Sequence, residues 1–393
     1  MDIILCVTGS IAATESIKLA REFRREGFNV KCFISEDGCK IIHPNSMEFA
    51  TGQKVVQELT GEIEHVKYAN SDLILVAPAT ANIISKFSYK IADNPINSLL
   101  ITADGHDTPI LFVPSMHDSM YNSINENIEK LKSEGFNFVE PRMEEGKAKF
   151  PSNDDILLEA KRAITLNMLK KNENLKINNL AGKKILITLG GTYEAIDPVR
   201  GISNKSSGKM GLELAKEAYI QGMEVKLIVG KVDVEIPKSF DSIFVESSDV
   251  MNQKTKELIS DYDIFIATAA VSDFAPIDKV ESKLSSSLNL SLEFKPTEKI
   301  IKQIKEINPD IFLVGFKAEY NIADDKMIKL AEKQIKEAGT DLVVANDVNI
   351  KECGFGSDNN QVILVDNDNV NKIDICSKKE ISKIVLDKIN TRL

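Results

Sequence analysis

The segment VRGISNKSSGKMG, residues 199–211, gathers serine, glycine and lysine residues directly ahead of a stretch with the apolar periodicity of a helix. The free N–H groups and the dipole at a helix start favour a phosphate or carboxylate. The segment is not a P-loop, because six residues separate Gly201 from Gly208, where that motif has four, and Met210 replaces its Ser or Thr. The spacing alone leaves two interpretations open, a generic anion site and an ordinary polar loop that caps a helix.

The first third of the chain holds all four histidines and two further turns of this kind. Gly9 and Ser10 lie between a predicted strand and a predicted helix, as does the segment APATAN at 77–82. His65 precedes one apolar strand and His117 ends another. Hydroxyls with free N–H groups can hold a terminal phosphate, and imidazoles can transfer protons near neutral pH. Each signal is weak alone, since tight turns need glycine and single histidines often cap or pack.

The composition narrows the class of protein. The chain has 49 Lys and Arg against 59 Asp and Glu, a net charge of −10, and no segment interleaves basic with aromatic residues, which argues against nucleic acid as a partner. Polar residues break the apolar stretches and the N-terminus lacks a basic flank, so we expect no membrane segment and a cytoplasmic location. The five cysteines have no metal or redox spacing, and we expect most of them to be small buried side chains.

Two series of strands and helices must position these groups. In the first series we predict strands at 2–9, 29–35, 72–79 and 109–116, and helices at 14–27, 80–87 and 123–135. In the second series we predict strands at 183–191, 224–230, 263–273, 311–319 and 341–347, and a helix at 209–222. Near-continuous apolar strands that alternate with helices predict α/β domains with buried parallel sheets.

We therefore predict two doubly wound domains, at 1–165 and 183–393, joined by an Asn- and Lys-rich linker at 166–182. In such sheets ligands collect at the carboxyl ends of the strands, which is where the polar turns lie.

The first half resembles the homo-oligomeric flavin-containing cysteine decarboxylases in four motifs, which are VTGSIAA, LILVAPATANIISK, IADN and VPSMHDSMY. The resemblance implies a flavodoxin-like domain that binds FMN. It implies FMN contacts from Gly9, Ser10, Ser35, Thr80 and Asn82 and a catalytic base at His65. Flavin would supply the electron sink that a carboxylate next to a thiol-bearing carbon lacks.

Two departures from that family concern catalysis. His117 stands where the family has Asn, which places a titratable group in the site. The family also carries an acidic Cys in a flap, whereas the corresponding PRMEEGKAKFPSNDD has none. Glu144, Glu145, Lys147 or Lys149 can take its place, or the mechanism differs, and the sequence does not choose among these alternatives.

The second half resembles phosphopantothenate–cysteine ligase in TLGGTYEAIDPVRGISNKSSGKMG, IATAAVSDF, ESKLSSS, VGFKAE and LVVANDV followed by GFGSDNN. The resemblance implies a Rossmann-like domain in which Asn204 contacts an acyl-cytidylate and Lys283 a phosphate. It places CTP against Asp273, Lys283, Phe316, Lys333 and Lys336. The phosphate of the substrate would lie on Ser206, Ser207 and Gly208. Activation of a carboxylate by a nucleotide needs positioning, Mg²⁺ and cations more than a general base. This requirement suits the second half of the chain, which has no histidine.

Together the two resemblances imply a bifunctional enzyme of coenzyme A biosynthesis that takes phosphopantothenate, cysteine and CTP, with FMN and Mg²⁺ or Mn²⁺. They also imply a homo-oligomer, a dodecamer of flavin-domain trimers and ligase-domain dimers. One alternative is a nicotinamide-dependent dehydrogenase, NAD or NADP, although neither half has the Gly-x-Gly-x-x-Gly fingerprint. Another is a flavoprotein binding module whose decarboxylase half is inert.

Overall fold

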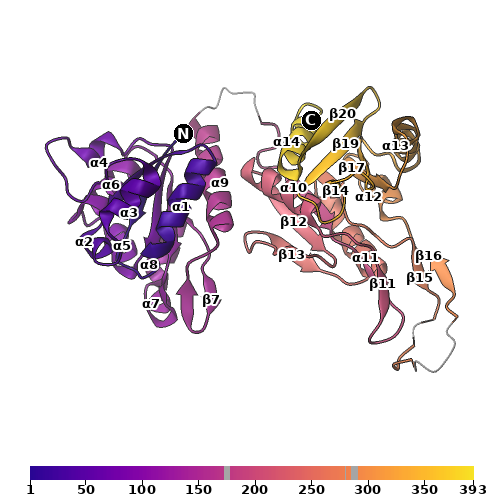
Figure 1. Ribbon diagram of the computed structural model, residues 1–393, viewed down its shortest axis with the longest axis horizontal. Helices are drawn as coiled ribbons and strands as arrows, with labels where there is room; N and C mark the ends of the chain where they lie inside the picture. Colours follow the sequence, from indigo (N-terminus) through magenta and orange to yellow (C-terminus); the bar gives the residue numbers. More distant parts are fainter. Residues whose placement is uncertain (172–177, 279, 285–290) are drawn as a thin grey trace. The chain divides into compact units, whose positions relative to one another are not determined.

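The computed structural model describes residues 1–171, 178–278, 280–284 and 291–393. The chain divides into two compact units, Met1–Leu175 and Lys176–Leu393. Each unit is an α/β sandwich with helices on both faces of a central sheet (Figure 1).

The sheet of the first unit has five parallel strands in the order β2-β1-β3-β4-β6. This is the flavodoxin-like order, so the predicted doubly wound fold is confirmed. The strands are β1 (Asp2–Val7), β2 (Asn29–Ile34), β3 (Leu73–Ala79), β4 (Ile110–Pro114) and β6 (Asn137–Phe138). The helices are α1 (Ala13–Arg25), α2 (Glu36–Cys39), α3 (Pro44–Thr51), α4 (Glu64–Lys67), α5 (Ala81–Ser88), α6 (Pro95–Asp104), α7 (Asp118–Ser123), α8 (Asn125–Ser133) and α9 (Asn153–Lys171).

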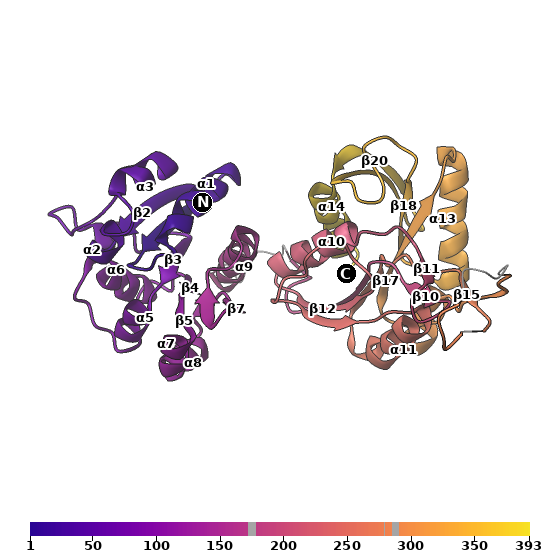
Figure 2. The same cartoon turned by 60° about the horizontal axis from the view of Figure 1, so that its bottom comes forward.

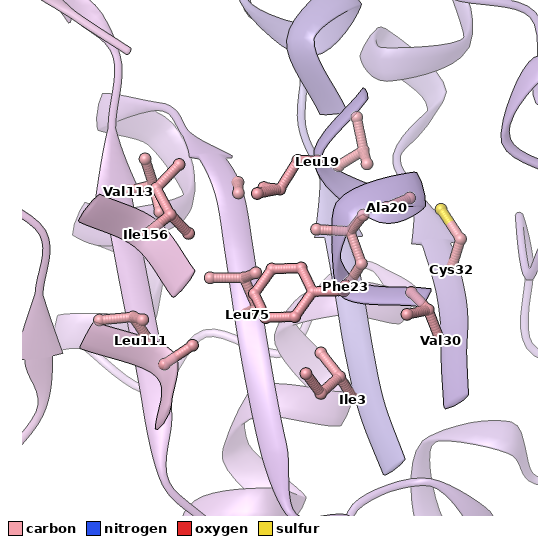
Figure 3. Close-up of a cluster of buried hydrophobic side chains, with 14 of the residues drawn as sticks. Ile3, Leu19, Ala20, Phe23, Val30, Cys32, Leu75, Leu111, Val113 and Ile156 are labelled. Carbon is pink, nitrogen blue, oxygen red and sulfur yellow. The ribbon is translucent and has the colours of Figure 1, made fainter. Parts of the chain in front are cut away.

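Successive residues of these strands enter different hydrophobic cores because side chains alternate across a strand. Ile3 and Leu5 pack under α1, α3 and α9, whereas Ile4 and Cys6 pack under α5, α6 and α8. Figure 3 shows Phe23 of α1 lying over the sheet beside Leu75. Both faces are thus apolar, which explains the near-continuous hydrophobic runs in the sequence.

A small antiparallel sheet stands apart from the main sheet of this unit. It has the order β5-β8-β7 and consists of β5 (Met116–His117), β7 (Arg142–Glu144) and β8 (Lys147–Lys149). The hairpin of β7 and β8 carries Glu144, Glu145, Lys147 and Lys149, the four candidates to replace the flap Cys.

The sheet of the second unit has eight strands in the order β13-β12-β9-β14-β17-β18-β19-β20. The six strands from β13 to β18 are parallel and follow the Rossmann order 3-2-1-4-5-6. The strands are β9 (Lys184–Leu189), β12 (Glu224–Val229), β13 (Asp241–Phe244), β14 (Ile264–Ala267), β17 (Phe312–Glu319), β18 (Leu342–Asp347), β19 (Asn359–Val365) and β20 (Val370–Ser377).

Helices cover both faces of this sheet as well. Those of the second unit are α10 (Lys209–Ile220), α11 (Ser248–Leu258), α12 (Ile304–Ile307), α13 (Asp324–Ala338) and α14 (Lys378–Asn390), with short 3-10 turns η1 (Ile259–Asp261) and η2 (Ile300–Lys302). α13 packs on β18 and β19 from one side, and α14 packs on β19 and β20 from the other (Figure 2). Two hairpins extend from the unit, formed by β10 (Tyr193–Ala195) with β11 (Gly201–Ser203) and by β15 (Phe274–Pro276) with β16 (Phe294–Pro296).

The structure differs from the sequence-based picture at two places. The predicted linker at 166–182 begins too early, because α9 continues to Lys171. Ile156, Ala160 and Ile164 bury one face of α9 in the core, and the polar residues after them extend the same helix. Residues 172–177 of that linker lie outside the described residues. The second sheet is not purely parallel, because β19 and β20 return in antiparallel directions.

Candidate active sites

A pocket of about 1120 Å³ lies at the carboxyl ends of β9 and β14, where the strand order of the second sheet reverses. Its lining includes Thr188 and Gly190 at the end of β9, Ala267 at the end of β14 and residues 268–271 after it. Reversal of strand order opens a crevice between the loops above neighbouring strands, which is where doubly wound proteins bind ligands.

The serine- and glycine-rich loop forms one wall of this pocket. The Nδ2 atom of Asn204 donates to the carbonyl oxygens of Ala270 (3.0 Å) and Val271 (3.3 Å), which ties the loop to the end of β14. Gly208 precedes α10 with φ +79°, in the left-handed region that favours glycine, and a Cβ there would approach Val232 Cγ1 to 2.5 Å. The loop is therefore held by tertiary contacts and delivers the start of α10 to the pocket.

A second loop, residues 353–358, closes the pocket beside the first. Cys353, Gly354 and Phe355 line the pocket. The side chain of Lys209 donates to Gly356 O (2.7 Å) and pairs with Asp358 (2.7 Å), and this hydrogen bond lowers the pKa of Asp358. The two loops are thus joined across the pocket rim.

Acidic, aromatic and basic groups line the opposite side. Asp273 forms an ion pair with Lys299, and both line the pocket. Phe316 on β17 lies in the lining, as does Lys333 on α13, whose Nζ is 3.6 Å from Glu337. This side of the pocket therefore offers one ligand an aromatic ring for stacking, a carboxylate and several cations.

The pocket brings together most of the predicted site residues of the second half. Those in its lining are Asn204, Ser206, Ser207, Gly208, Asp273, Phe316 and Lys333. Lys336 lies outside the lining, because the face of α13 that borders the pocket carries Leu330, Lys333, Gln334 and Glu337. Lys283 is exposed and also lies outside the lining; the next residue, Leu284, donates its N–H to Asp197 (3.2 Å). The last residues of ESKLSSS, 285–287, lie outside the described residues.

Sequence reasoning missed four lysines of the pocket lining, which are Lys299, Lys302, Lys317 and Lys378. Lys299 belongs to FKPTEK, whose pocket contacts the sequence left in doubt. Lys378 begins α14, almost at the end of the chain, and reaches the pocket only through the fold. Nothing local distinguishes Lys378 from the other lysines of its helix.

In the first unit, turns after four parallel strands meet at the carboxyl edge of the sheet. The hydroxyl of Thr8 donates to Pro78 O (2.7 Å) and accepts from the N–H of Thr80 (3.3 Å). The hydroxyl of Ser10 donates to Ser115 O (3.3 Å). These bonds join the turns after β1, β3 and β4 at the point where the strand order reverses.

The donor set at this edge fits a phosphate-bearing flavin. Ser35 accepts a cap bond from Gly38 N (3.0 Å) and Thr80 one from Ile83 N (3.4 Å), so each hydroxyl keeps its own O–H to donate. Asn82 is exposed in the first turn of α5. Hydroxyls, an amide and helix starts at a switch point are the groups that bind a mononucleotide in this fold.

The two predicted histidines lie in different surroundings. His65 is on α4, which packs against α6, and its Nδ1 atom is buried without a hydrogen-bond partner among the described residues. His117 is 64% exposed and lies 3.9 Å from Asp118. It pairs in register with Lys147 of the hairpin, which places these two residues opposite each other on the small sheet.

The hairpin distributes its charged residues unevenly. Lys149 lies 3.2 Å from Glu144 and 3.0 Å from Glu145, and its hydrogen bond to Glu145 lowers the pKa of Glu145. Lys147 stands opposite both His117 and Glu144 in the three-stranded sheet. Of the four candidate groups, Lys147 is the one in register with His117.

Three further observations concern metal-binding groups, membrane-spanning helices and cysteines. Within the described ranges no group of three or more His, Cys, Asp or Glu side chains is arranged to hold a metal ion. No helix in those ranges is long and apolar enough to cross a bilayer. Cys6, Cys32 and Cys353 are buried, and burial raises the pKa of each thiol, in agreement with the prediction that most cysteines are small core residues.

Comparison with known proteins covers the whole chain. The family model described as Flavoprotein matches residues 1–165, and the DNA/pantothenate metabolism flavoprotein C-terminal domain matches residues 180–393. A Thermococcus kodakarensis protein named Coenzyme A biosynthesis bifunctional protein CoaBC is 45% identical, over 100% of this chain and 95% of its own. Proteins of the same name from Methanocaldococcus jannaschii and Bacillus subtilis are 39% and 33% identical, over 98% and 99% of this chain and 93% and 96% of theirs. A solved DNA/pantothenate metabolism flavoprotein from Streptococcus pneumoniae superposes with a TM-score of 0.49 at 29% identity, over 54% of this chain and 100% of that one.

Proposed function

The chain belongs to the CoaBC family of bifunctional coenzyme A biosynthesis proteins, and we propose that its second unit joins phosphopantothenate to cysteine at the expense of CTP while its first unit decarboxylates the product with FMN. Full-length similarity to relatives of that name is the observation that carries this proposal. Because the chain belongs to this family, we no longer consider a nicotinamide-dependent dehydrogenase.

In the ligation, CTP would activate the carboxylate of phosphopantothenate as an acyl-cytidylate with loss of pyrophosphate. The amine of cysteine would then attack the acyl carbon and displace CMP to form the amide. The N–H groups of Ser206, Ser207 and Gly208 would hold the phosphate of the substrate at the start of α10, and Asn204 would face the reacting carbonyl. Asp273, Phe316 and Lys333 would hold the nucleotide. Mg²⁺ or Mn²⁺ would enter with the triphosphate. A role for Lys283 or Lys336 stays a prediction, since both lie outside the pocket lining.

In the decarboxylation, FMN would supply the electron sink that allows the carboxylate to be lost as CO₂. Gly9, Ser10, Ser35, Thr80 and Asn82 would hold it at the carboxyl edge of the first sheet. We propose that His65 acts as the base and that His117 contacts the substrate. As the acid that takes the place of the flap Cys, we favour Lys147, because it is in register with His117. Lys149 is less suited, because it already pairs with two carboxylates.

We also propose a cytoplasmic homo-oligomer, the dodecamer of trimers and dimers that the resemblance implies. Large apolar side chains on the two hairpins of the second unit support a dimer contact there, for example Val199, 61% exposed, and Phe274, 56% exposed. Such side chains are costly to leave in water over a contiguous surface. Light scattering of the purified protein measures the oligomeric state directly.

Purified protein tests both half-reactions separately. With phosphopantothenate, cysteine and CTP we expect release of CMP and pyrophosphate, and absence of CMP would overturn the ligase assignment. The protein should be yellow and should release CO₂ from phosphopantothenoylcysteine. A yellow protein that releases none would support the inert binding module instead.

A further inference from the structure

Lys378, the first residue of α14, is a lysine buried in the wall of the ligase pocket. Its side chain is 5% exposed. The ammonium donates to Gly354 O (2.9 Å) and Ser357 O (2.5 Å), and burial, together with the charge of Lys209, lowers its pKa. A buried charge destabilises the fold unless its hydrogen bonds are satisfied. The two carbonyl oxygens satisfy the charge of Lys378, and they belong to the loop at 353–358. We therefore look for the role of Lys378 in its hold on this loop.

The loop that Lys378 holds is bound from its other side by the serine- and glycine-rich loop. Lys209 donates to Gly356 O (2.7 Å), and the N–H of Gly356 donates to the hydroxyl of Ser207 (3.3 Å). The loop at 353–358 thus lies between two lysines, one on each helix start, and α10 packs against α14 behind them. Gly354 and Gly356 have φ of +87° and +79°, in the left-handed region that favours glycine, which allows the tight turn that brings these carbonyls to the two lysines.

The loop at 353–358 in turn fixes the serine- and glycine-rich loop. Ser207 and Lys209 flank Gly208, the residue before α10, and both are fixed through Gly356. If the loop at 353–358 moves, the hydroxyl of Ser207 loses its partner and Lys209 loses a carbonyl. Preorganised N–H groups bind an anion better than groups that must be ordered on binding.

We propose that Lys378 is a positioning residue of the ligation: it clamps the loop at 353–358 against Ser207 and Lys209 and thereby preorganises the site for the phosphate of the pantothenate substrate. The inference rests on the proposed ligase function. It is specific to one substrate, because the clamp acts on the loop at the start of α10 and not on Asp273 or Phe316, which border the predicted nucleotide site.

The test is Lys378→Met in the full-length chain, with KM and kcat measured for each substrate. We expect the KM for phosphopantothenate to rise about 10-fold or more, because the variant loses both charge-assisted hydrogen bonds that hold the loop at 353–358. The KM values for CTP and cysteine and the kcat should stay within about threefold, since the nucleotide side keeps its contacts. Lys383→Met, an exposed position on the same helix, is the matched control and should change none of these values.

Two measurements separate this role from a purely structural one. CO₂ release by the same sample reports whether the chain is folded in its first unit, and thermal melting reports the second. Lys209→Met, whose side chain is 32% exposed, removes the other half of the clamp and should raise the same KM. It carries the test if Lys378→Met does not fold. A fall in kcat with unchanged KM, or an equal rise in the KM values for phosphopantothenate and CTP, would overturn the proposal. Failure of the wild-type chain to release CMP would instead overturn the ligase function itself.

Discussion

At the scale of single residues, Asn204 anchors the serine- and glycine-rich loop through its Nδ2 atom. Its Nδ2 donates to two carbonyl oxygens, and its Oδ1 does not take part in those bonds. Asn204→Asp replaces the donor by a carboxylate oxygen that repels both carbonyls and an acyl phosphate. We expect kcat/KM for ligation to fall by about 100-fold or more. CO₂ release in the same sample should be unchanged, and a ligation rate within threefold of wild type would contradict the assignment.

His65 differs from an ordinary surface histidine in one respect, its buried Nδ1 atom without a hydrogen-bond partner among the described residues. A buried polar atom left without a partner is costly and often serves a function. His65→Asn keeps the approximate size but removes the base, and we expect CO₂ release to fall about 100-fold. Ligation provides the internal control. His106→Asn, at another histidine of the same unit, should leave both rates unaltered.

At the scale of elements, α10 lies so close to its sheet that one position tolerates no side chain. A Cβ on Gly211 would stand 2.5 Å from both Leu189 Cβ and Thr268 Oγ1. Gly211→Ala should therefore push α10 off the sheet and reduce stability by roughly 1 to 3 kcal/mol. Thermal melting measures the loss. Gly61→Ala, where a Cβ meets nothing within 4 Å, is the control, and equal melting temperatures for the two variants would refute the packing argument.

The carboxylate of Asp366 joins the turn between β19 and β20 to the C-terminal end of α14. The side chain of Asp366 is 7% exposed and lies 2.8 Å from Lys388 and 3.0 Å from Arg392. Burial raises its pKa, but hydrogen bonds from Lys388 and from the N–H groups of Asp368 and Asn369 outweigh this and hold the pKa at about 2. A lowered pKa means that the charged form stabilises the fold. The stabilisation is therefore complete above about pH 4 and is lost as the pH falls towards 2.

Asp366→Asn should accordingly lower the free energy of unfolding by roughly 1 to 2 kcal/mol at pH 7. Urea denaturation at several pH values measures the difference from wild type, which we expect to persist to about pH 4 and shrink below it. Asp368→Asn is the control. Its carboxylate pairs with Arg392 but is 64% exposed, so its loss should matter far less. A constant difference at all pH values would argue against an ionic role for Asp366.

At the scale of the whole molecule, the two candidate sites lie in separate compact units of one chain. A mixture of Asn204→Asp chains and His65→Asn chains should therefore convert phosphopantothenate to phosphopantetheine, because each chain supplies the half-reaction that the other lacks. Chromatography of the products measures the conversion. If each variant performs its own half-reaction normally but the mixture yields only the unmixed background, the intermediate passes between sites without release, and independent action of the units is wrong.

Much of the fold could be predicted because its signals are local. Buried strands such as β3 and β9 appear as unbroken apolar runs, and each ends in a turn of small or polar residues that the sequence displays. The length of α9 could not be predicted, since Asn and Lys residues follow its buried face without a period of their own. The antiparallel return of β19 and β20 was also missed, because strand direction depends on the connection and not on the strand.

The sequence by itself determined the two doubly wound units, the loops at their switch points and, through resemblance, the residues Asn204, Asp273 and Phe316 of one pocket. Periodicity and motif spacing are properties of neighbouring residues, so they survive in a linear chain. Only the tertiary structure decided that Lys333 and not Lys336 lines the pocket, that Lys299 pairs with Asp273, and that Lys378 holds the pocket wall. Such contacts join distant positions, as Lys209 and Gly356 do across 147 residues, and no local pattern records them because they form only when the sheet brings its strand ends together.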